Sequence, residues 1–310
     1  MNRSLKATAV ATTFCAVAGA GLVGYGEVTA RAETQVMGQA QTQTMSTTTA
    51  RHGHGDSFSG TKKIRVDGYS VNVSCSGHSS ARKPVVVLMA GGGDGLDQVA
   101  DLQKTLSKKS RVCSYDRLGE GESDQPNGTQ TMNDSARILT GVLDRITGDR
   151  PVVLAGHSMG GLIAARYAPD HLDKVKGLVL LDATIPSLTA GISKAIPESA
   201  TGDAVAIRDG AIAANEGQNA EKFIIADEKV RSAGRIPVQI IKHESQYAEV
   251  PVYGPALEQM WSKGQHEWLA LSCRSSLSTA AGSGHYIYVD RPDLAVKAIQ
   301  RVTAQATARW

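Results

Sequence analysis

The chain has 310 residues, of which 41% are hydrophobic and 20% are charged. That composition is ordinary for a globular protein and argues against wholesale disorder or a fibrous repeat. The 33 Lys and Arg residues against 30 Asp and Glu residues give a formal charge of +3, too weak a bias to indicate nucleic acid as a partner.

The first residues follow the order of a secretory signal. Arg3 and Lys6 precede an uncharged stretch at 7–26 that is rich in Ala, Val, Leu and Gly, and Ala30-Arg31-Ala32 offers a small-x-small cleavage site. We therefore predict a signal peptide at 1–32 and a secreted protein. Thr and Gly residues dilute the stretch, which disfavours a membrane span. After cleavage we expect no stable membrane anchor.

Residues 33–59 are mostly Gln, Thr, Ser and Gly with almost no aliphatic side chains. Such a segment buries too little apolar surface to offset its ordering entropy, so we expect a flexible leader. His52 and His54 lie in its Gly-rich part, where we expect solvated side chains rather than a metal site. The folded domain is predicted at 60–310.

The domain begins with a hairpin pattern and continues with short apolar runs. Ile64 and Val66 alternate with polar residues, Asp67-Gly68 can form a tight turn, and the alternation then resumes. Strands that are apolar on both faces belong in a parallel sheet covered by helices. The runs of this kind lie at 84–89, 111–115, 151–155, 177–181 and 237–241.

Helical periods separate these runs, at 99–106, 139–146 and 293–308. Strands alternating with helices predict an α/β doubly wound domain. Residues 183–236 interrupt the rhythm, with expected helices at 204–214 and 221–232. Active sites lie beyond the carboxyl ends of such strands, where this insertion emerges. We therefore interpret it as a helical cap over the site rather than as an insertion without a functional role.

The central motif places a serine between a strand and a helix, in Gly156-His157-Ser158-Met159-Gly160. Small flanking residues let backbone segments approach closely in a strained turn, which presents the Ser158 hydroxyl at the positive end of the following helix. This context favours a nucleophile over a structural turn.

A serine nucleophile needs a base within hydrogen-bond reach. His285 lies in a Gly-rich loop before the closing helix, in the chain order serine, acid, histidine that this architecture uses. We select it as the base. His243 and His266 are expected on the surface or in the cap.

Two carboxylates can orient the imidazole of His285. Asp182 ends the strand at 177–181, and Glu244 follows the strand at 237–241. We prefer Asp182 because catalytic groups gather at strand ends, and Glu244 stays open as the alternative acid.

Acyl chemistry also requires donors for the developing oxyanion. We expect them to be the backbone N–H groups of Met159, just after the nucleophile, and of Gly92, in the Gly run after the strand at 84–89. A phosphate-binding role for this Gly run is disfavoured, because neither a following Lys-Ser/Thr nor a dinucleotide fingerprint accompanies it.

Three segments in this order resemble the α/β-hydrolase superfamily, in particular its secreted actinobacterial-type serine hydrolases. They are the turn at 156–161, the segment 115–124, and Ser283-Gly284-His285 ahead of Asp290-Arg291-Pro292. The resemblance implies a mostly parallel sheet of about eight strands, helices on both faces, and a small helical cap inserted between strands 6 and 7. It also implies Ser158 as nucleophile, His285 as base, and Gly92 with Met159 as the oxyanion hole.

Similar secreted relatives carry cysteines in two neighbouring strands, which here implies a disulfide between Cys75 and Cys113 and leaves Cys273 free. The chain also departs from the family pattern. Ala90 stands where many relatives have His, and no Gly-x-x-Asp follows Ile241, which leaves the acid undecided. Ser158 in place of Asp does not support an epoxide hydrolase or dehalogenase.

We therefore expect a secreted serine hydrolase that cleaves a small-molecule carboxylic ester, lactone or thioester through an acyl-enzyme, without metal or organic cofactor. An amidase or aminopeptidase, or a biosynthetic acyltransferase or cyclase, would use the same residues. A different class is a non-catalytic ligand-binding protein that has kept the serine turn.

Overall fold

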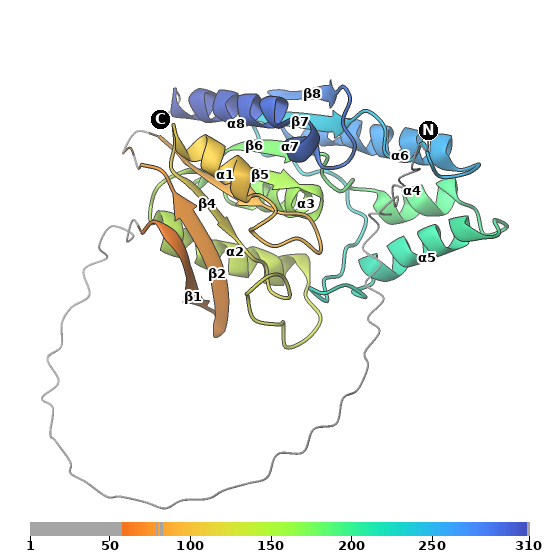
Figure 1. Cartoon of the computed structure of the whole chain (residues 1–310), viewed down its shortest axis with the longest axis horizontal. Coiled ribbons are helices and arrows are strands. Elements are labelled where there is room, and N and C mark those ends of the chain that lie inside the picture. The colour runs from red at the N-terminus through yellow and green to blue at the C-terminus, as the bar shows by residue number, and fades with distance from the viewer. Residues whose placement is uncertain (1–57, 79, 81–82, 309–310) are drawn as a thin grey trace, which may run out of the picture.

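The computed structural model describes residues 58–78, 80 and 83–308, which fold around one sheet (Figure 1). Within this part of the chain the strand order is β1-β2-β4-β3-β5-β6-β7-β8. The strands are β1 (Gly60–Val66), β2 (Tyr69–Ser76), β3 (Val85–Met89), β4 (Val112–Tyr115), β5 (Val152–His157), β6 (Val175–Leu181), β7 (Val238–His243) and β8 (Ser275–Ala280). The predicted signal peptide and residues 33–57 of the predicted leader lie outside the described residues.

The sheet opens with the predicted hairpin. Strands β1 and β2 pair antiparallel with Val66 opposite Tyr69, and the two residues between them, Asp67 and Gly68, have φ of 48° and 85°. Two left-handed residues give the turn the twist that a two-residue hairpin requires. Strand β2 then pairs antiparallel with β4, and all the remaining strand pairs are parallel.

Helices cover both faces of the parallel strands, which explains their continuous apolar runs. Along β3, Val85 and Val87 contribute to one hydrophobic cluster and Val86 and Leu88 to the other. On one side lie α2 (Met132–Thr147) and α3 (Ser158–Tyr167); on the other lie α1 (Ala100–Ser107) and α8 (Pro292–Thr307). The predicted α/β architecture and its helices are confirmed.

The predicted cap lies between β6 and β7. It contains α4 (Leu188–Ala195) and α5 (Asp203–Asn215), so the helix expected at 204–214 is confirmed. The helix expected at 221–232 is wrong, because that stretch forms no helix and pairs instead through isolated β-bridges at Phe223 and Ile224. Glu221, Phe223 and Ile225 are buried while Lys222 and Ile224 between them are exposed, a period of two that suits an extended segment.

Two elements near the C-terminus were not singled out from the sequence. Helix α6 (Gly254–Glu267) packs against α4. The two helices share a small apolar cluster, to which α4 contributes Ile192 and α6 contributes Leu257. Strand β8 is the polar edge of the sheet, with mostly half-buried or exposed residues. The short elements are η1 (Ala168–Asp170), η2 (Trp268–Leu271) and α7 (Ile287–Asp290).

The expected disulfide joins Cys75 of β2 to Cys113 of β4, and the prediction is confirmed. The two residues are direct partners in the antiparallel register and are fully buried. Cys273 is free and exposed. In the described part of the chain, no helix reaches the length and apolarity required to cross a bilayer.

Because the bridge closes a loop of 38 residues, its removal should destabilise the fold. We expect the double variant Cys75→Ala, Cys113→Ala to lose about 2–4 kcal/mol of the free energy of unfolding in urea. Cys273→Ala, which removes the exposed thiol, should leave that free energy unchanged. Equal stability of the double variant and the oxidised protein would contradict the expectation.

Candidate active site

Ser158 occupies a strained turn between β5 and α3, as the sequence predicts. Its φ is 49°, a left-handed value that a non-glycine residue rarely adopts. The flanking glycines permit the turn through close backbone contacts. A Cβ on Gly156 would lie 2.4 Å from the Gly160 carbonyl oxygen, and one on Gly160 would lie 2.4 Å from the Met89 carbonyl oxygen.

The Ser158 hydroxyl opens into a pocket that it shares with His285. Its Oγ lies 3.5 Å from Oγ1 of Thr184, and the Ser158 carbonyl accepts from the Thr184 N–H at 3.0 Å. Among the hydrogen bonds of the described residues, none joins Ser158 to His285. The expected serine–histidine hydrogen bond is therefore not formed in the structure.

His285 follows β8 in the predicted Gly-rich loop, and its ring is fixed from behind by Asp182. Nδ1 of His285 lies 2.6 Å from Oδ2 of Asp182. With Nδ1 donating to this carboxylate, Nε2 is the nitrogen left to exchange a proton on the pocket side.

Asp182 stands at the end of β6, with 0% of its side chain exposed and a φ of 47°. Oδ1 accepts from the His243 N–H at 3.0 Å and from the Trp261 indole at 2.9 Å, while Oδ2 faces both His243 Nδ1 and His285 Nδ1 at 2.6 Å. Burial opposes ionisation, but the hydrogen bonds from His243 and His285 outweigh it and hold the pKa of Asp182 below its ordinary value.

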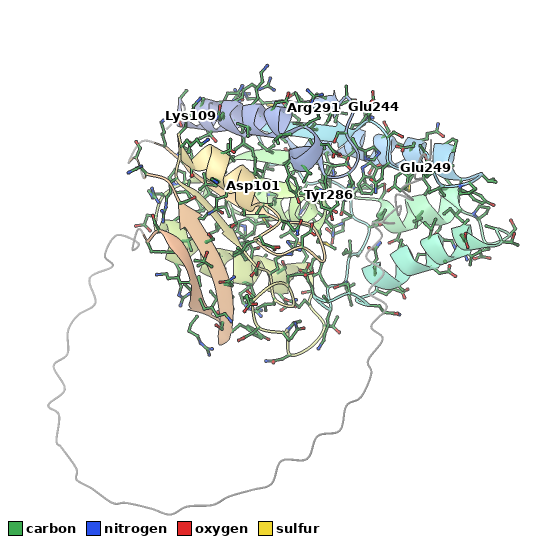
Figure 2. All side chains as sticks on the ribbon, viewed as in Figure 1. Asp101, Lys109, Glu244, Glu249, Tyr286 and Arg291 are labelled. Carbon is green, nitrogen blue, oxygen red and sulfur yellow. A yellow bond between two sulfur atoms is a disulfide. The ribbon has the colours of Figure 1, made fainter. Side chains whose placement is uncertain are left out.

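Glu244, the alternative acid, is placed elsewhere. Its side chain is exposed (Figure 2) and accepts the Gly282 N–H at 2.8 Å. The Glu244 N–H in turn donates to the Ser283 carbonyl at 3.0 Å. Glu244 therefore anchors the loop that carries His285, whereas Asp182 contacts the imidazole itself.

His243 belongs to the site, so its predicted position on the surface or in the cap is wrong. It is the last residue of β7 and its side chain is 2% exposed. Nδ1 faces Asp182, and Nε2 lies 2.8 Å from Oε2 of Glu258 in α6. The signal available in the sequence was its position at the end of an apolar run. His266 is exposed, as expected.

Asp182, His243 and His285 are also the one group of the described residues with possible metal-ligand atoms within 4.8 Å of one another. Both histidines direct Nδ1 at the same carboxylate oxygen at hydrogen-bond distance, and Glu258 occupies the other nitrogen of His243. These contacts account for the group as a hydrogen-bond network, so we assign it no metal.

The predicted oxyanion donors, Gly92 and Met159, both line the same pocket. Met159 is the second residue of α3, so its N–H is one of those without an acceptor inside the helix. The Gly92 loop is held by Arg117, whose guanidinium donates to the carbonyls of Ala90 at 2.6 Å and Gly91 at 2.7 Å. The structure thus brings both backbone segments beside Ser158.

The same arginine ties the loop to the cap. Arg117 forms a buried bidentate pair with Glu221, with N–O distances of 2.8 and 2.7 Å. Because two parallel bonds fix both position and orientation, the cap segment at Glu221 and the loop at Ala90 and Gly91 are joined through one side chain.

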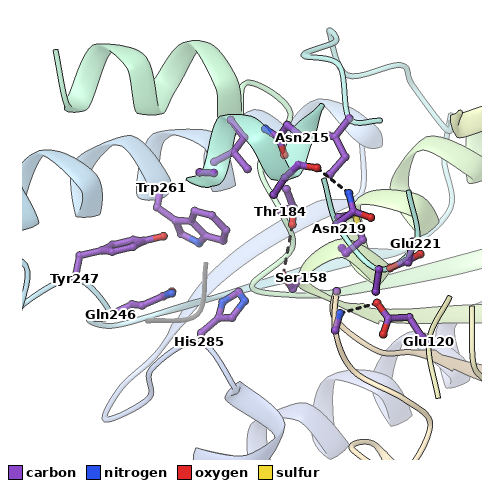
Figure 3. Close-up of a pocket in the computed structure, with 18 residues that line it drawn as sticks. Glu120, Ser158, Thr184, Asn215, Asn219, Glu221, Gln246, Tyr247, Trp261 and His285 are labelled. Atoms are coloured by element: carbon purple, nitrogen blue, oxygen red, sulfur yellow. Dashed lines mark hydrogen bonds between the residues drawn. The ribbon is translucent and has the colours of Figure 1, made fainter. Parts of the chain in front are cut away.

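The pocket has an apolar side formed by the cap, an aromatic wall and an acidic wall (Figure 3). Trp261, Tyr247 and His285 lie on one wall, and Glu120 and Glu221 lie on the other. The apolar lining comes largely from the cap and consists of Leu188, Ala211, Ala214, Ala220 and Ile225. Such a lining suits an uncharged acyl group better than a carboxylate.

Glu120, a residue that no sequence pattern indicates, lies buried in the pocket wall next to the loop that carries Gly92. Its Oε1 accepts the Gly93 N–H at 2.7 Å. Burial and then the neighbouring Glu221 carboxylate raise the pKa of Glu120 to about 7.

Comparison with known proteins agrees with the fold. A family model described as alpha/beta hydrolase fold matches residues 84–206. An uncharacterized protein of Schizosaccharomyces pombe is 30% identical over 138 residues, which are 36% of this chain and 26% of that protein. A proline iminopeptidase of Saccharolobus solfataricus is 28% identical over 134 residues, 38% of this chain and 43% of the relative. The matches thus span less than half of these two relatives.

Longer matches exist at lower identity. The uncharacterized protein YqjL of Bacillus subtilis is 24% identical over 79% of this chain and 92% of its own. The enol-lactonase of Burkholderia xenovorans LB400 has a TM-score of 0.54 at 21% identity, over 78% of this chain and 100% of its own. The carboxylesterase CesB of Bacillus subtilis has a TM-score of 0.54 at 16% identity, over 81% of this chain and 92% of the CesB chain. At such identities the two solved structures establish the fold.

The raised pKa of Glu120 predicts a pH-dependent effect of Glu120→Gln on stability. The pKa of the Glu120 carboxyl is about 7 in the folded chain, against an ordinary value of 4.5. Its contribution to the free energy of unfolding is therefore fully present below pH 4.5 and is lost as the pH rises toward 7. We expect the melting temperature of Glu120→Gln relative to wild type to be higher at pH 8 than at pH 5.

Glu122→Gln is the matched control, since it removes the same charge from an exposed side chain in the same loop. Its melting temperature relative to wild type should not change between the two pH values. A Glu120→Gln difference that is the same at pH 5 and pH 8 would show that Glu120 titrates normally.

Proposed function

We propose that this chain, which belongs to the α/β-hydrolase superfamily, is a serine hydrolase that cleaves a small-molecule carboxylic ester, lactone or thioester through an acyl-enzyme. One observation carries the proposal. His285 is held at 2.6 Å by a fully buried carboxylate, and it lines the pocket into which a strained turn presents the Ser158 hydroxyl.

The residues supply each group that the reaction requires. Ser158 Oγ attacks the carbonyl carbon while Nε2 of His285 takes its proton, and the Asp182 carboxylate stabilises the imidazolium that forms. The carbonyl oxygen gains the negative charge, which the N–H groups of Gly92 and Met159 would stabilise. Collapse of this intermediate breaks the bond to the leaving oxygen or sulfur, which receives the proton from His285.

The second half of the cycle repeats these steps with water. His285 takes a proton from a water molecule, whose oxygen attacks the acyl carbon of the ester at Ser158. Breakdown returns the proton to Ser158 Oγ and releases the carboxylic acid. No cofactor is invoked in either half.

Two alternatives use the same groups. The relative described as a proline iminopeptidase favours an amidase or aminopeptidase, and an acyltransferase or cyclase would replace water with another nucleophile. The likeness to an enol-lactonase and a carboxylesterase, together with an apolar pocket, supports the ester and lactone substrates. Rates on matched esters and amides of one acyl group would separate these functions.

The assignment of the acid gives the sharpest test of the mechanism. We expect Ser158→Ala to abolish labelling by a fluorophosphonate and Asp182→Asn to lower kcat on a p-nitrophenyl ester by about 10³–10⁴-fold, because the imidazole loses its orientation and its charge partner. Glu244→Gln should keep most of the activity, since Glu244 contacts only the loop backbone.

Circular dichroism on the three variants would separate a lost catalytic group from a lost fold. A folded Asp182→Asn as active as wild type would remove Asp182 from the mechanism. If intact wild type takes up no fluorophosphonate, the chain is a ligand-binding protein rather than a hydrolase.

We also infer export through the signal at 1–32, supported by the Cys75–Cys113 disulfide, a bond that persists mainly outside the cytosol. Expression in a bacterium that secretes proteins should yield a mature chain in the medium that begins at Glu33. N-terminal sequencing of the medium and of the cells checks this. A full-length chain retained in the cells would contradict the inference.

A further inference from the structure

His243 holds the catalytic carboxylate without itself lining the pocket. Its ring donates to Oδ2 of Asp182 from Nδ1 at 2.6 Å, and its backbone N–H donates to Oδ1 at 3.0 Å. The other ring nitrogen, Nε2, lies 2.8 Å from Oε2 of Glu258. Both ring nitrogens therefore face carboxylate oxygens.

This arrangement fixes the charge of the ring. A neutral imidazole has one donor and one acceptor nitrogen, and an acceptor facing a carboxylate would be repelled. Only the imidazolium donates on both sides, so His243 is the cation between two anions. Burial opposes that charge, but Asp182 and then Glu258 outweigh it and raise the pKa of His243 above its ordinary value.

The neighbours of His243 come from four elements. Asp182 follows β6, Glu258 and Trp261 belong to α6, Tyr247 lies in the segment between β7 and α6, and His285 follows β8. Among these neighbours the anions are the carboxylates of Asp182 and Glu258. Two negative charges therefore face the single positive charge of the His243 ring.

Glu258 is itself fixed by the backbone. Its Oε1 accepts the N–H groups of Gln246 at 2.5 Å and Tyr247 at 2.6 Å, while Oε2 faces His243. These bonds keep the carboxylate in place and lower its pKa against the effect of burial. The anion that keeps His243 protonated is therefore part of the folded scaffold.

Neither His243 nor Glu258 belongs to the described residues that line the pocket with Ser158. His243 thus acts on the reaction through Asp182. The cation at His243 supplies a counter-charge that the buried Asp182 carboxylate requires.

We propose that His243, held protonated between Asp182 and Glu258, is a positioning residue that keeps Asp182 ionised and aimed at His285. The inference rests on the proposed serine hydrolase function for its effect on rate, and on the hydrogen-bond geometry alone for the charge of His243.

The charge predicts an alkaline limit to activity. Since the pKa of folded His243 is raised, its pairing with the carboxylates is fully present below its ordinary pKa of 6.5 and is lost as the pH rises through the raised value. Glu258→Gln removes one of the two anions, so this loss should move to lower pH while the contact with Asp182 remains.

Three variants separate the charge from the hydrogen bond. We expect His243→Ala to lower kcat by about 10²-fold with little change in KM, because Asp182 loses its orientation. His243→Asn keeps one amide donor for Asp182 without the charge, so it should lose less activity and lack the alkaline limit. His243→Ala can fail to fold, in which case His243→Asn and Glu258→Gln carry the test.

Two matched controls remove the same groups from exposed positions. The first control is His266→Gln, at an exposed position on α6. The second is Glu249→Gln, at an exposed position in the segment between β7 and α6 (Figure 2). Both should reproduce the wild-type kcat, KM and pH profile.

Nuclear magnetic resonance of histidine labelled with ¹⁵N gives a readout independent of activity. We expect both ring nitrogens of His243 to be protonated at pH 7 in wild type, and the ring of Glu258→Gln to titrate at lower pH. A neutral His243 at pH 7, or folded His243→Ala and His243→Asn with the wild-type kcat, would overturn the proposal. Absence of fluorophosphonate labelling would instead refute the hydrolase function, and the rate role of His243 with it.

Discussion

The arrangement of the site depends on one buried carboxylate receiving four donors. Asp182 lies at the end of β6 and accepts from the backbone and ring of His243, the indole of Trp261 and the ring of His285. An uncompensated carboxylate inside a protein is costly, so each donor has to be in place when the chain is folded. This requirement couples the ends of β6 and β7, helix α6 and the loop after β8, four segments far apart in the sequence.

A second constraint shapes the nucleophile side of the pocket. The turn at Ser158 adopts its left-handed conformation because glycines let strand β5, helix α3 and the end of β3 approach within contact distance. Arg117 then fixes the neighbouring loop by binding two of its carbonyls and the cap residue Glu221 at once. The serine and the expected oxyanion donors are thus set by backbone packing, which leaves their positions little freedom.

These two constraints meet at the pocket, which both His285 and Ser158 line. The Nδ1 side of His285 belongs to the carboxylate network and its other edge faces the pocket with Ser158. The division gives the site a rigid acid half, fully buried and charged, and an open half in which the serine hydroxyl now contacts Thr184.

Local sequence determined the hairpin at Asp67-Gly68, the buried parallel strands, the turn around Ser158 and the choice of His285, because turn chemistry and periodicity are properties of neighbouring residues. Both Asp182 and Glu244 follow strands, and only the tertiary structure showed that Asp182 contacts the His285 imidazole while Glu244 contacts the backbone of the loop that carries it. The tertiary structure also placed His243 and Glu120 at the site, through their contacts with Glu258 and Gly93. It made 221–225 extended, with Glu221 bound to Arg117. The partners in these three contacts are 15 to 104 residues apart in the sequence. Such partners are set by the order of strands in the sheet, which brings distant strand ends to one edge, and no local pattern records them.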